Sequence, residues 1–204
     1  MKNKLQLRAN VANPLTGNIR VPGDKSTSHR SLIFGALSIG VTKVTGMLEA
    51  EDVMATADAL KKMGIKITKH NNVWEIVGAG VGGLKKPNCP LDFGNAGTGS
   101  RLMMGVLASH GFSADFTGDA SLCSRPMGRV INPLAEIGAT ISGDNDKKMP
   151  FTFIGTDNPL PIEYTLPMAS AQVKSAILLA GLNISGKTII HEPIATRNHT
   201  EKMM

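Results

Sequence analysis

The chain has 204 residues, of which 42% are hydrophobic and 19% are charged, and these proportions exclude a disordered chain. They provide enough apolar material for one core and part of a second. The net charge of +6 favours an anionic partner, which could be nucleic acid, a membrane surface or a phosphorylated metabolite, although a basic soluble surface explains it equally well.

Cys89 and Cys123 are the only cysteines, so a disulfide framework is not expected, and neither lies in a metal-ligand pair. Residues 1–17 lack the apolar core of a signal peptide, and the longest apolar stretch, 176–182, is too short to span a bilayer. Aromatic residues are scarce, which argues against a platform for single-stranded nucleic acid. We therefore expect a cytoplasmic protein without a membrane or nucleic-acid partner.

Three segments along the chain begin with small or hydroxyl residues and continue into an apolar run with helical spacing. They read GDKSTSHRSLIFGAL, GNAGTGSRLMMGVLA and PMASAQVKSAILLAG. Aligning them places three small residues in register: Ser26, Gly97 and Ser170. The same alignment places three basic residues in register: Arg30, Arg101 and Lys174. The sequence therefore predicts three copies of one loop-to-helix unit.

The segments after these helices repeat as well. A glycine turn leads into a short strand, read as VTKVTG, FSADFTG and KTIIHE. A second helix comes next over 51–64 and 125–138, with Pro126 placed at the start of the latter. Both helices end at a glycine, Gly64 or Gly138, which predicts a left-handed cap. Two strands with a polar turn close each of these copies: 65–70 with 73–78, and 139–144 with 150–155.

The repeating unit is therefore strand, helix, strand, helix, strand, strand, and the predicted fold class is α/β. The third copy opens with YTLPMASAQ, and its second helix begins near residue 197. Neither a closing glycine nor a final pair of strands follows in the sequence. We expect an incomplete third unit, either in part of a longer protein or in a naturally short variant.

Each helix start is a candidate anion site, because free backbone N–H groups and the helix dipole favour negative charge there. Basic residues near these starts can add charge-assisted contacts: Lys25, Arg30, Arg101, Arg125, Lys174 and Arg197. Packing of the copies around a pseudo-threefold axis would bring the starts together on one face. The alternative stays open that the small residues are only helix caps and the basic residues are solvated or paired.

Two patterns typical of nucleotide-binding sites occur in the sequence, but the elements predicted around them are the wrong ones. Residues 181–188 match the phosphate-loop pattern GxxxxGKT, but the pattern follows a helix and opens a strand, which is the reverse of a nucleotide site. Residues 78–83 match GxGxxG, but two prolines come after it and no helix can begin there. His29 and His199 lack a second ligand at metal spacing. We expect neither a metal nor a cofactor.

Five motifs occur in an order that resembles the 5-enolpyruvylshikimate-3-phosphate synthase family, in its second class: PGDKSTSHR, LDFGNAGTGSRL, GDASLCSRPMGR, PMASAQVKSAILLAGL and TRNHTEKM. The resemblance implies the enolpyruvyl transferase fold, with three βαβαββ units around a pseudo-threefold axis, helices inside and sheets outside. It implies that this chain is the amino-terminal part. Residues 1–17 would form a strand segment of an absent second domain, and residues 18–204 a substrate-binding domain whose third unit is incomplete.

The resemblance also implies roles for individual residues. Residues expected to contact shikimate 3-phosphate are Lys25, Ser26, Arg30, Ser170, Ala171, Gln172 and Arg197. Residues expected around phosphoenolpyruvate are Lys25, Gly97, Thr98 and Arg125. The catalytic contribution of this chain is assigned to Lys25, Arg125 and Gln172. Gly97 stands where glyphosate-tolerant enzymes carry Ala, which implies room for glyphosate as an inhibitor.

The implied reaction moves the enolpyruvyl group of phosphoenolpyruvate to the 5-hydroxyl of shikimate 3-phosphate and releases phosphate. The resemblance assigns the acid-base residues to the second domain, so the chain alone is expected to be inactive, and the complete protein is expected to be a monomer. Two alternatives remain: a UDP-N-acetylglucosamine enolpyruvyl transferase, with Cys123 near the position of its loop cysteine, and a non-catalytic module that binds phosphorylated ligands or RNA.

Overall fold

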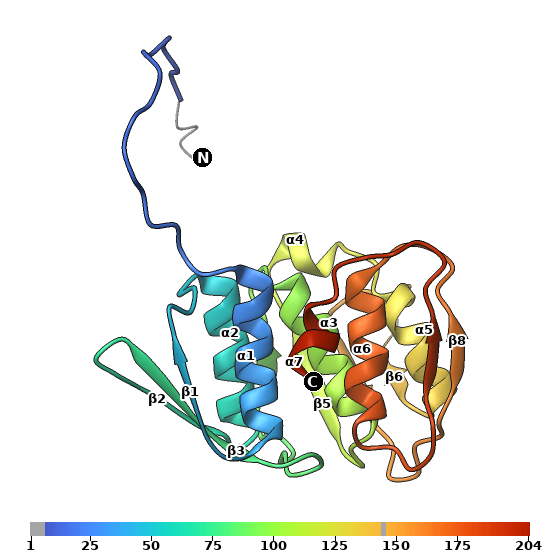
Figure 1. Ribbon diagram of the computed structural model, residues 1–204. Helices are drawn as coiled ribbons and strands as arrows, with labels where there is room; N and C mark the ends of the chain where they lie inside the picture. The colour runs from blue at the N-terminus through green and yellow to red at the C-terminus, as the bar shows by residue number, and fades with distance from the viewer. Residues whose placement is uncertain (1–6, 144–145) are drawn as a thin grey trace.

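The computed structural model of the chain describes residues 7–143 and 146–204. Residues 7–23 carry no helix or strand; residues 20–23 lie against the body of the protein, and the part before them extends away from it (Figure 1). Within the described residues this segment has no neighbouring strand with which to pair, and an isolated extended segment is not stable as a strand. The assignment of residues 1–17 to a second domain stays a prediction, and residues 1–6 of it lie outside the described residues.

The three predicted loop-to-helix junctions are confirmed, and each opens a long helix: α1 (Lys25–Leu37), α3 (Gly97–Ala108) and α6 (Ala171–Gly181). Two of them are capped by a side chain that accepts from a backbone N–H of the first turn. Asp24 Oδ1 accepts from Thr27 N at 2.7 Å, and Ser170 Oγ accepts from Val173 N at 3.3 Å. The N-cap residue of α3, Ala96, makes no such bond, and the Gly97 amide donates to the carbonyl of Asn95 at 2.8 Å.

Three further helices occupy the second position of the units: α2 (Glu51–Lys62), α5 (Gly128–Ile137) and α7 (His199–Met203). Gly64 and Gly138 adopt φ of +91° and +116°, which confirms the predicted left-handed caps. Helix α5 begins at Gly128 and not at Pro126, because the N–H of Met127 donates to the carbonyl of Lys147 and holds the chain in a turn.

The short helix α4 (Ala120–Cys123) was not predicted. It depends on one cap, in which the Asp119 carboxylate accepts from Leu122 N at 2.7 Å.

Strands lie in three sheets among the described residues. The first sheet has the order β1 (Ile39–Thr45), β3 (Val73–Ala79), β2 (Lys66–His70). The second has the order β4 (Leu91–Asp92), β5 (Ser113–Thr117), β7 (Phe151–Ile154), β6 (Thr140–Ser142). The third pairs β8 (Glu163–Thr165) with β9 (Ile189–His191). The predicted strand pairs of the first two copies are therefore confirmed.

The opening strand of a unit pairs parallel with the strand that follows its first helix, as the registers Leu91↔Phe116 and Glu163↔Ile189 show. This is a strand-helix-strand crossover. Within the described residues the first unit lacks this opening strand, so its sheet has three strands where the second unit has four. The unit is otherwise repeated as predicted, and the α/β fold of repeated units is confirmed.

The long helices pack side by side with the sheets on the outside (Figure 1). Helix α3 is central, and most of its side chains are buried. It approaches α6 so closely at Gly105 that an added Cβ would lie 2.3 Å from the carbonyl oxygen of Ala176. Behind α3, the second sheet contributes a cluster of stacked rings, with Phe93 and Phe116 centroids 5.2 Å apart. The close contact between α3 and α6 at Gly105, called the seam below, fixes the relative position of the amino termini of these two helices.

The phosphate-loop and GxGxxG patterns lie outside helix starts, as predicted. Residues 181–188 form the turn between α6 and β9, and residues 78–83 lie at the end of β3 and in the turn after it. In the described part of the chain, none of the helices has the length and apolar content needed to cross a bilayer. The same part holds no group of His, Cys, Asp and Glu side chains suited to a metal ion.

Candidate functional site

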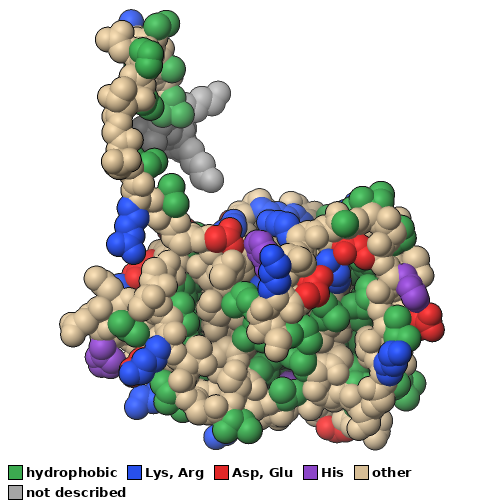
Figure 2. All heavy atoms as spheres, in the orientation of Figure 1, with side chains coloured by type: hydrophobic (Ala, Val, Ile, Leu, Met, Phe, Trp, Pro, Cys, Tyr) green, Lys and Arg blue, Asp and Glu red, His purple; other side chains and the backbone are tan. Residues whose placement is uncertain are grey.

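The amino-terminal ends of four helices surround one cavity of about 810 Å³. Lys25 comes from the start of α1, Asp52 from α2, Thr98 from α3 and Gln172 from α6. Arg125, from the turn between α4 and α5, completes the wall. The structure thus brings Lys25, Arg125 and Gln172 to a shared cavity, as the repeat predicted. Figure 2 shows Lys and Arg side chains, with Asp and Glu beside them, along the upper edge of this view.

One wall of the cavity is basic and is held by amide and hydroxyl groups. Arg101 NH1 donates to the carbonyl of Gly97 at 3.1 Å and to Gln172 Oε1 at 3.3 Å. Gln172 Nε2 in turn donates to Thr98 Oγ1 at 2.9 Å. This chain of hydrogen bonds links α3 to α6 and orients the amide of Gln172. Burial lowers the pKa of Arg101, and the nearby charges of Arg125 and Arg129 lower it further.

Arg125 is oriented by polar neighbours. Its NH2 group donates to Asn95 Oδ1 at 2.5 Å and to Ser121 Oγ at 3.1 Å. Asn95 is itself held by a bond from its Nδ2 to the Asp119 carboxylate at 2.7 Å. These bonds orient Arg125, and within the described residues its charge has no direct carboxylate partner.

The opposite wall carries acidic side chains: Glu49, Glu51 and Asp52. Lys25 forms an ion pair with Asp52 at 2.8 Å. Burial acts to raise the pKa of Asp52, but the hydrogen bond and charge of Lys25 outweigh it, and the pKa falls below its usual value. The cavity is thus polarised, with Lys25 restrained by an acidic partner on one side and a group of guanidinium charges on the other.

His29 lies behind this acidic wall and is completely buried. Its Nδ1 is 2.8 Å from Thr56 Oγ1. Burial lowers its pKa to about 4, although Asp52 opposes the change, so the ring is neutral near pH 7. His29 is therefore a packed side chain.

A second cavity of about 560 Å³ adjoins the first and shares Gln172 with it. It lies at the start of α6, where Ser170 and Ala171 face Arg197 from the loop before α7. The start of a helix and a guanidinium group on opposite sides suit a phosphate group. Three of the residues assigned to the shikimate phosphate are thus grouped around Gln172.

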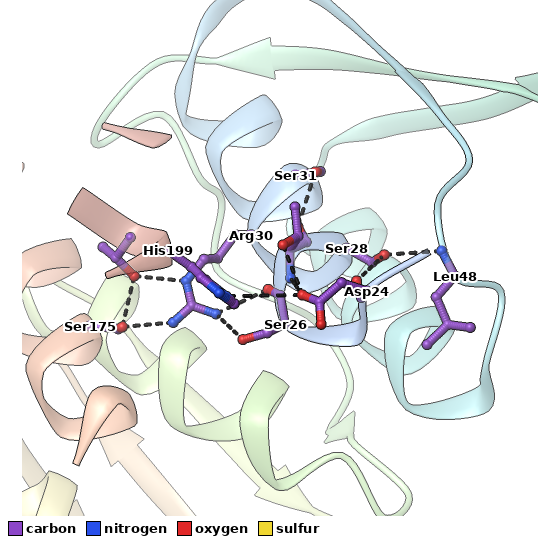
Figure 3. A network of polar contacts seen from close by, with 10 residues as sticks. Asp24, Ser26, Ser28, Arg30, Ser31, Leu48, Ser175 and His199 are labelled. Carbon is purple, nitrogen blue, oxygen red and sulfur yellow. Dashed lines mark hydrogen bonds and ion pairs between the residues drawn. The ribbon is translucent and has the colours of Figure 1, made fainter. Parts of the chain in front are cut away.

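Two predicted substrate residues are placed differently. Arg30 is only 3% exposed and lines none of the cavities described above. Its guanidinium donates to Thr200 Oγ1 and to Ser175 Oγ, each at 2.7 Å, and to Ser26 Oγ at 2.8 Å (Figure 3). Ser26 is therefore engaged by Arg30 at the edge of the site. Their contacts with a substrate stay predictions.

Sequence reasoning missed Arg129, which lies four residues after Arg125 in RPMGR, in the first turn of α5. Arg129 joins Arg101 and Arg125 around a third cavity of about 280 Å³, which also contains Ser170 and Gln172. Among residues 7–143 and 146–204, no carboxylate forms an ion pair with any of these three arginines. Three like charges that lack a carboxylate partner among the described residues create a positive potential that favours an anionic ligand. The spacing of the two arginines in the motif was the available signal.

The architecture is that of the enolpyruvyl transferase fold class, with repeated α/β units whose helix starts converge on a cavity suited to anions. A family model described as EPSP synthase (3-phosphoshikimate 1-carboxyvinyltransferase) matches residues 10–204. The chain belongs to the EPSP synthase family.

Similar proteins agree with this assignment. The 3-phosphoshikimate 1-carboxyvinyltransferase of Parvibaculum lavamentivorans is 55% identical over 199 residues, which are 97% of this chain and 44% of that protein. The protein of the same name from Brucella canis is 56% identical over 190 residues, covering 93% and 42%. The solved EPSP synthase of Acinetobacter baumannii matches with a TM-score of 0.86 and 49% identity, over 92% of this chain and 42% of that one. The chain therefore spans less than half the length of these relatives.

Proposed function

We propose that this chain supplies the cationic part of an EPSP synthase active site. The complete reaction transfers the enolpyruvyl group of phosphoenolpyruvate to the 5-hydroxyl of shikimate 3-phosphate. The observation that carries the proposal is the single polarised cavity shared by Lys25, Arg125 and Gln172. Both substrates are polyanions, and a cavity lined by guanidinium groups and helix starts is suited to bind them.

The chemistry explains why cations are needed. Protonation of the methylene carbon of phosphoenolpyruvate makes C2 electrophilic, and the 5-hydroxyl oxygen adds to C2 and loses its proton. The methyl group of the resulting intermediate then loses a proton as the C2–O bond to phosphate breaks, which restores the double bond and releases inorganic phosphate. Negative charge accumulates on the departing phosphate, and preorganised cations stabilise it.

In this proposal, Lys25 and Arg125 hold phosphoenolpyruvate in the larger cavity, whose lining includes both. Ser170, Ala171 and Arg197 hold the phosphate of shikimate 3-phosphate in the adjoining cavity, which they line. Gln172 lines both cavities, so its amide can contact both reactants. We further propose that glyphosate, also a polyanion, binds in the larger cavity beside Gly97, and that the proton-transfer groups lie in the remaining length of the relatives.

The alternative of a UDP-N-acetylglucosamine enolpyruvyl transferase has less support. Cys123 is partly buried in α4, with Sγ 3.3 Å from the carbonyl of Gly118, and it does not line the cavity. A competition titration with shikimate 3-phosphate and UDP-N-acetylglucosamine separates the two functions. Binding of the nucleotide sugar alone would overturn our proposal.

The direct test is calorimetric titration of the chain with shikimate 3-phosphate and then phosphoenolpyruvate, comparing wild type with Lys25→Met. Loss of a charge-assisted contact should weaken binding roughly 10- to 100-fold. Lys66→Met, at an exposed position on β2, is the matched control and should bind normally. We expect phosphate release only after addition of the carboxy-terminal part of a relative. Equal binding by Lys25→Met and wild type, or turnover by the chain alone, would contradict the proposal.

A further inference from the structure

Lys174 is buried one turn into α6, where a charged side chain is costly unless it is fully paired. Its Nζ lies 2.7 Å from Glu192 Oε2 and 2.7 Å from Glu201 Oε1. Burial acts against the charged form, but the two carboxylates outweigh it and raise the pKa of Lys174. The ammonium group is thus a permanent bridge between two carboxylates and lines neither of the substrate cavities.

The two carboxylates lie at opposite ends of one loop. Glu192 directly follows β9, and Glu201 lies in α7, so the intervening residues 193–198 are anchored at both ends by a single ammonium group. Glu192 also accepts a hydrogen bond from Thr196, inside the loop. The hydrogen bonds from Lys174 and Thr196 lower the pKa of Glu192, which keeps it ionised.

The anchored loop carries Arg197, and with Ala195 and Thr196 this residue lines the cavity at the start of α6. Most of the loop is exposed, so few packing contacts restrain it. Helix α7 has a second restraint, since Thr200 is bonded to Arg30 and to Ser175. At the other end, the Glu192 side chain is held by Lys174 and by Thr196 of the loop itself.

We propose that Lys174 is a positioning residue, which fixes both ends of loop 193–198 and thereby holds Arg197 opposite the start of α6. The proposal rests on the proposed function only in assigning shikimate 3-phosphate to that cavity. Without the ammonium group, two adjacent carboxylates would repel each other, and the loop would move away from α6.

The first experiment measures the loop itself and needs no ligand. Backbone amide hydrogen exchange is compared in wild type, Lys174→Met and Lys174→Arg. Because Lys174→Met also lowers global stability, the local effect is the excess over the core helices. We expect a larger increase in exchange over residues 192–203 than in α1 and α3, and recovery in Lys174→Arg. An increase over 192–203 that is no larger than that in α1 and α3 would overturn the inference. If Lys174→Met does not fold, Glu192→Gln removes one anchor at nearly constant size and should show the same local effect.

The second experiment titrates shikimate 3-phosphate into four proteins: wild type, Lys174→Met, Arg197→Met and the double variant. Each single substitution should weaken binding roughly 10- to 100-fold, because one charge-assisted contact is lost or displaced. If Lys174 acts through Arg197, the double variant should be no weaker than Arg197→Met. Effects that multiply would contradict the positioning role. Lys187→Met, in the exposed turn after α6, is the matched control and should bind like wild type.

The two measurements separate two kinds of failure. Faster exchange in Lys174→Met, together with a wild-type chain that does not bind shikimate 3-phosphate, would reject the proposed function and support the role of Lys174 in the loop. Binding by wild type that is unaffected in Lys174→Met would reject the positioning role and leave the proposed function intact.

Discussion

Arg101 in α3 and Lys174 in α6 hold the same place in the second and third units, but their surroundings are electrostatically opposite. Arg101 lies near the charges of Arg125 and Arg129, and its guanidinium donates to amide and carbonyl oxygens. Lys174 is enclosed by Glu192 and Glu201. The repeat therefore keeps the position of a cation and not its role. A cation without a counter-ion is available to a ligand, whereas a doubly paired one stabilises the fold.

The largest expected difference between these two residues is in stability. Lys174→Met leaves two carboxylates without their partner and should lower the free energy of unfolding by about 3–5 kcal/mol. Arg101→Met removes repulsion between like charges and should change it by less than about 1 kcal/mol, while weakening phosphoenolpyruvate binding. Urea unfolding of both variants tests this, and equal losses of stability would show that the two cations are equivalent after all.

The seam between α3 and α6 places both cations, so disturbing it should affect both regions. In Gly105→Ala the new methyl group meets the Ala176 backbone at 2.3 Å, and the helices must separate. We expect a loss of about 3 kcal/mol in the free energy of unfolding. Gly128→Ala is the control: its nearest neighbour is a flexible Lys147 carbon at 3.4 Å, so stability should be unchanged or slightly higher. Denaturation midpoints of the two variants give the comparison, and an equally stable Gly105→Ala would mean that the seam is not tightly packed.

The pH dependence of stability distinguishes the buried neutral His29 from the ionised pairs. Its pKa is about 4 in the folded protein and near 6.5 when unfolded, so the unfolded chain binds more protons between these values. Stability from this residue is complete above pH 6.5 and is lost as the pH falls toward 4, by about 3 kcal/mol in total.

Urea unfolding at several pH values from about 4.5 to about 7.5 measures this loss. His29→Gln should flatten the slope, whereas His70→Gln, on the exposed end of β2, should leave it unchanged. A slope that is the same in His29→Gln and wild type would assign the pH dependence to other groups.

The smallest expected effect on stability is that of Gly97→Ala in the basic wall. The added Cβ would lie 2.8 Å from Arg101 NH1 and 3.0 Å from Arg125 NH1, which are the mobile ends of long side chains. The side chains can move, so the free energy of unfolding should change by less than about 1 kcal/mol. The narrower cavity should bind glyphosate and phosphoenolpyruvate more weakly, as titration with each ligand would show. Unchanged affinities would place both ligands away from Gly97.

Local signals predicted much of the fold. The three loop-to-helix junctions, the glycine caps at Gly64 and Gly138 and the paired strands of the first two units each depend on residues close together in sequence, and these are confirmed. The exceptions depend on single local bonds: the Asp119 cap creates α4, and the bond from Met127 N to the Lys147 carbonyl delays the start of α5. Turns with and without such a bond are close in free energy, so the local sequence does not show which of them forms.

The site could be predicted only in outline. The repeat indicated that the helix starts converge, and the motifs indicated which residues line the cavity. Pairing over long distances was not visible, as with Arg30 and Thr200, which are 170 residues apart, or Lys174 and Glu192, which are 18 apart. These partners are selected by packing and not by local pattern, and they determine whether a cation is free or already neutralised.

The extended segment over residues 7–21 has a consequence for handling the protein. Leu7, Val11, Leu15 and Ile19 are each at least 89% exposed, and within the described residues the segment makes no hydrogen bond. Burying such a side chain against another apolar surface lowers the free energy by roughly 1.5–3 kcal/mol when the side chain is fully buried. Self-association at high protein concentration should therefore occur through this segment. Removing the segment should improve solubility without disturbing the cavity.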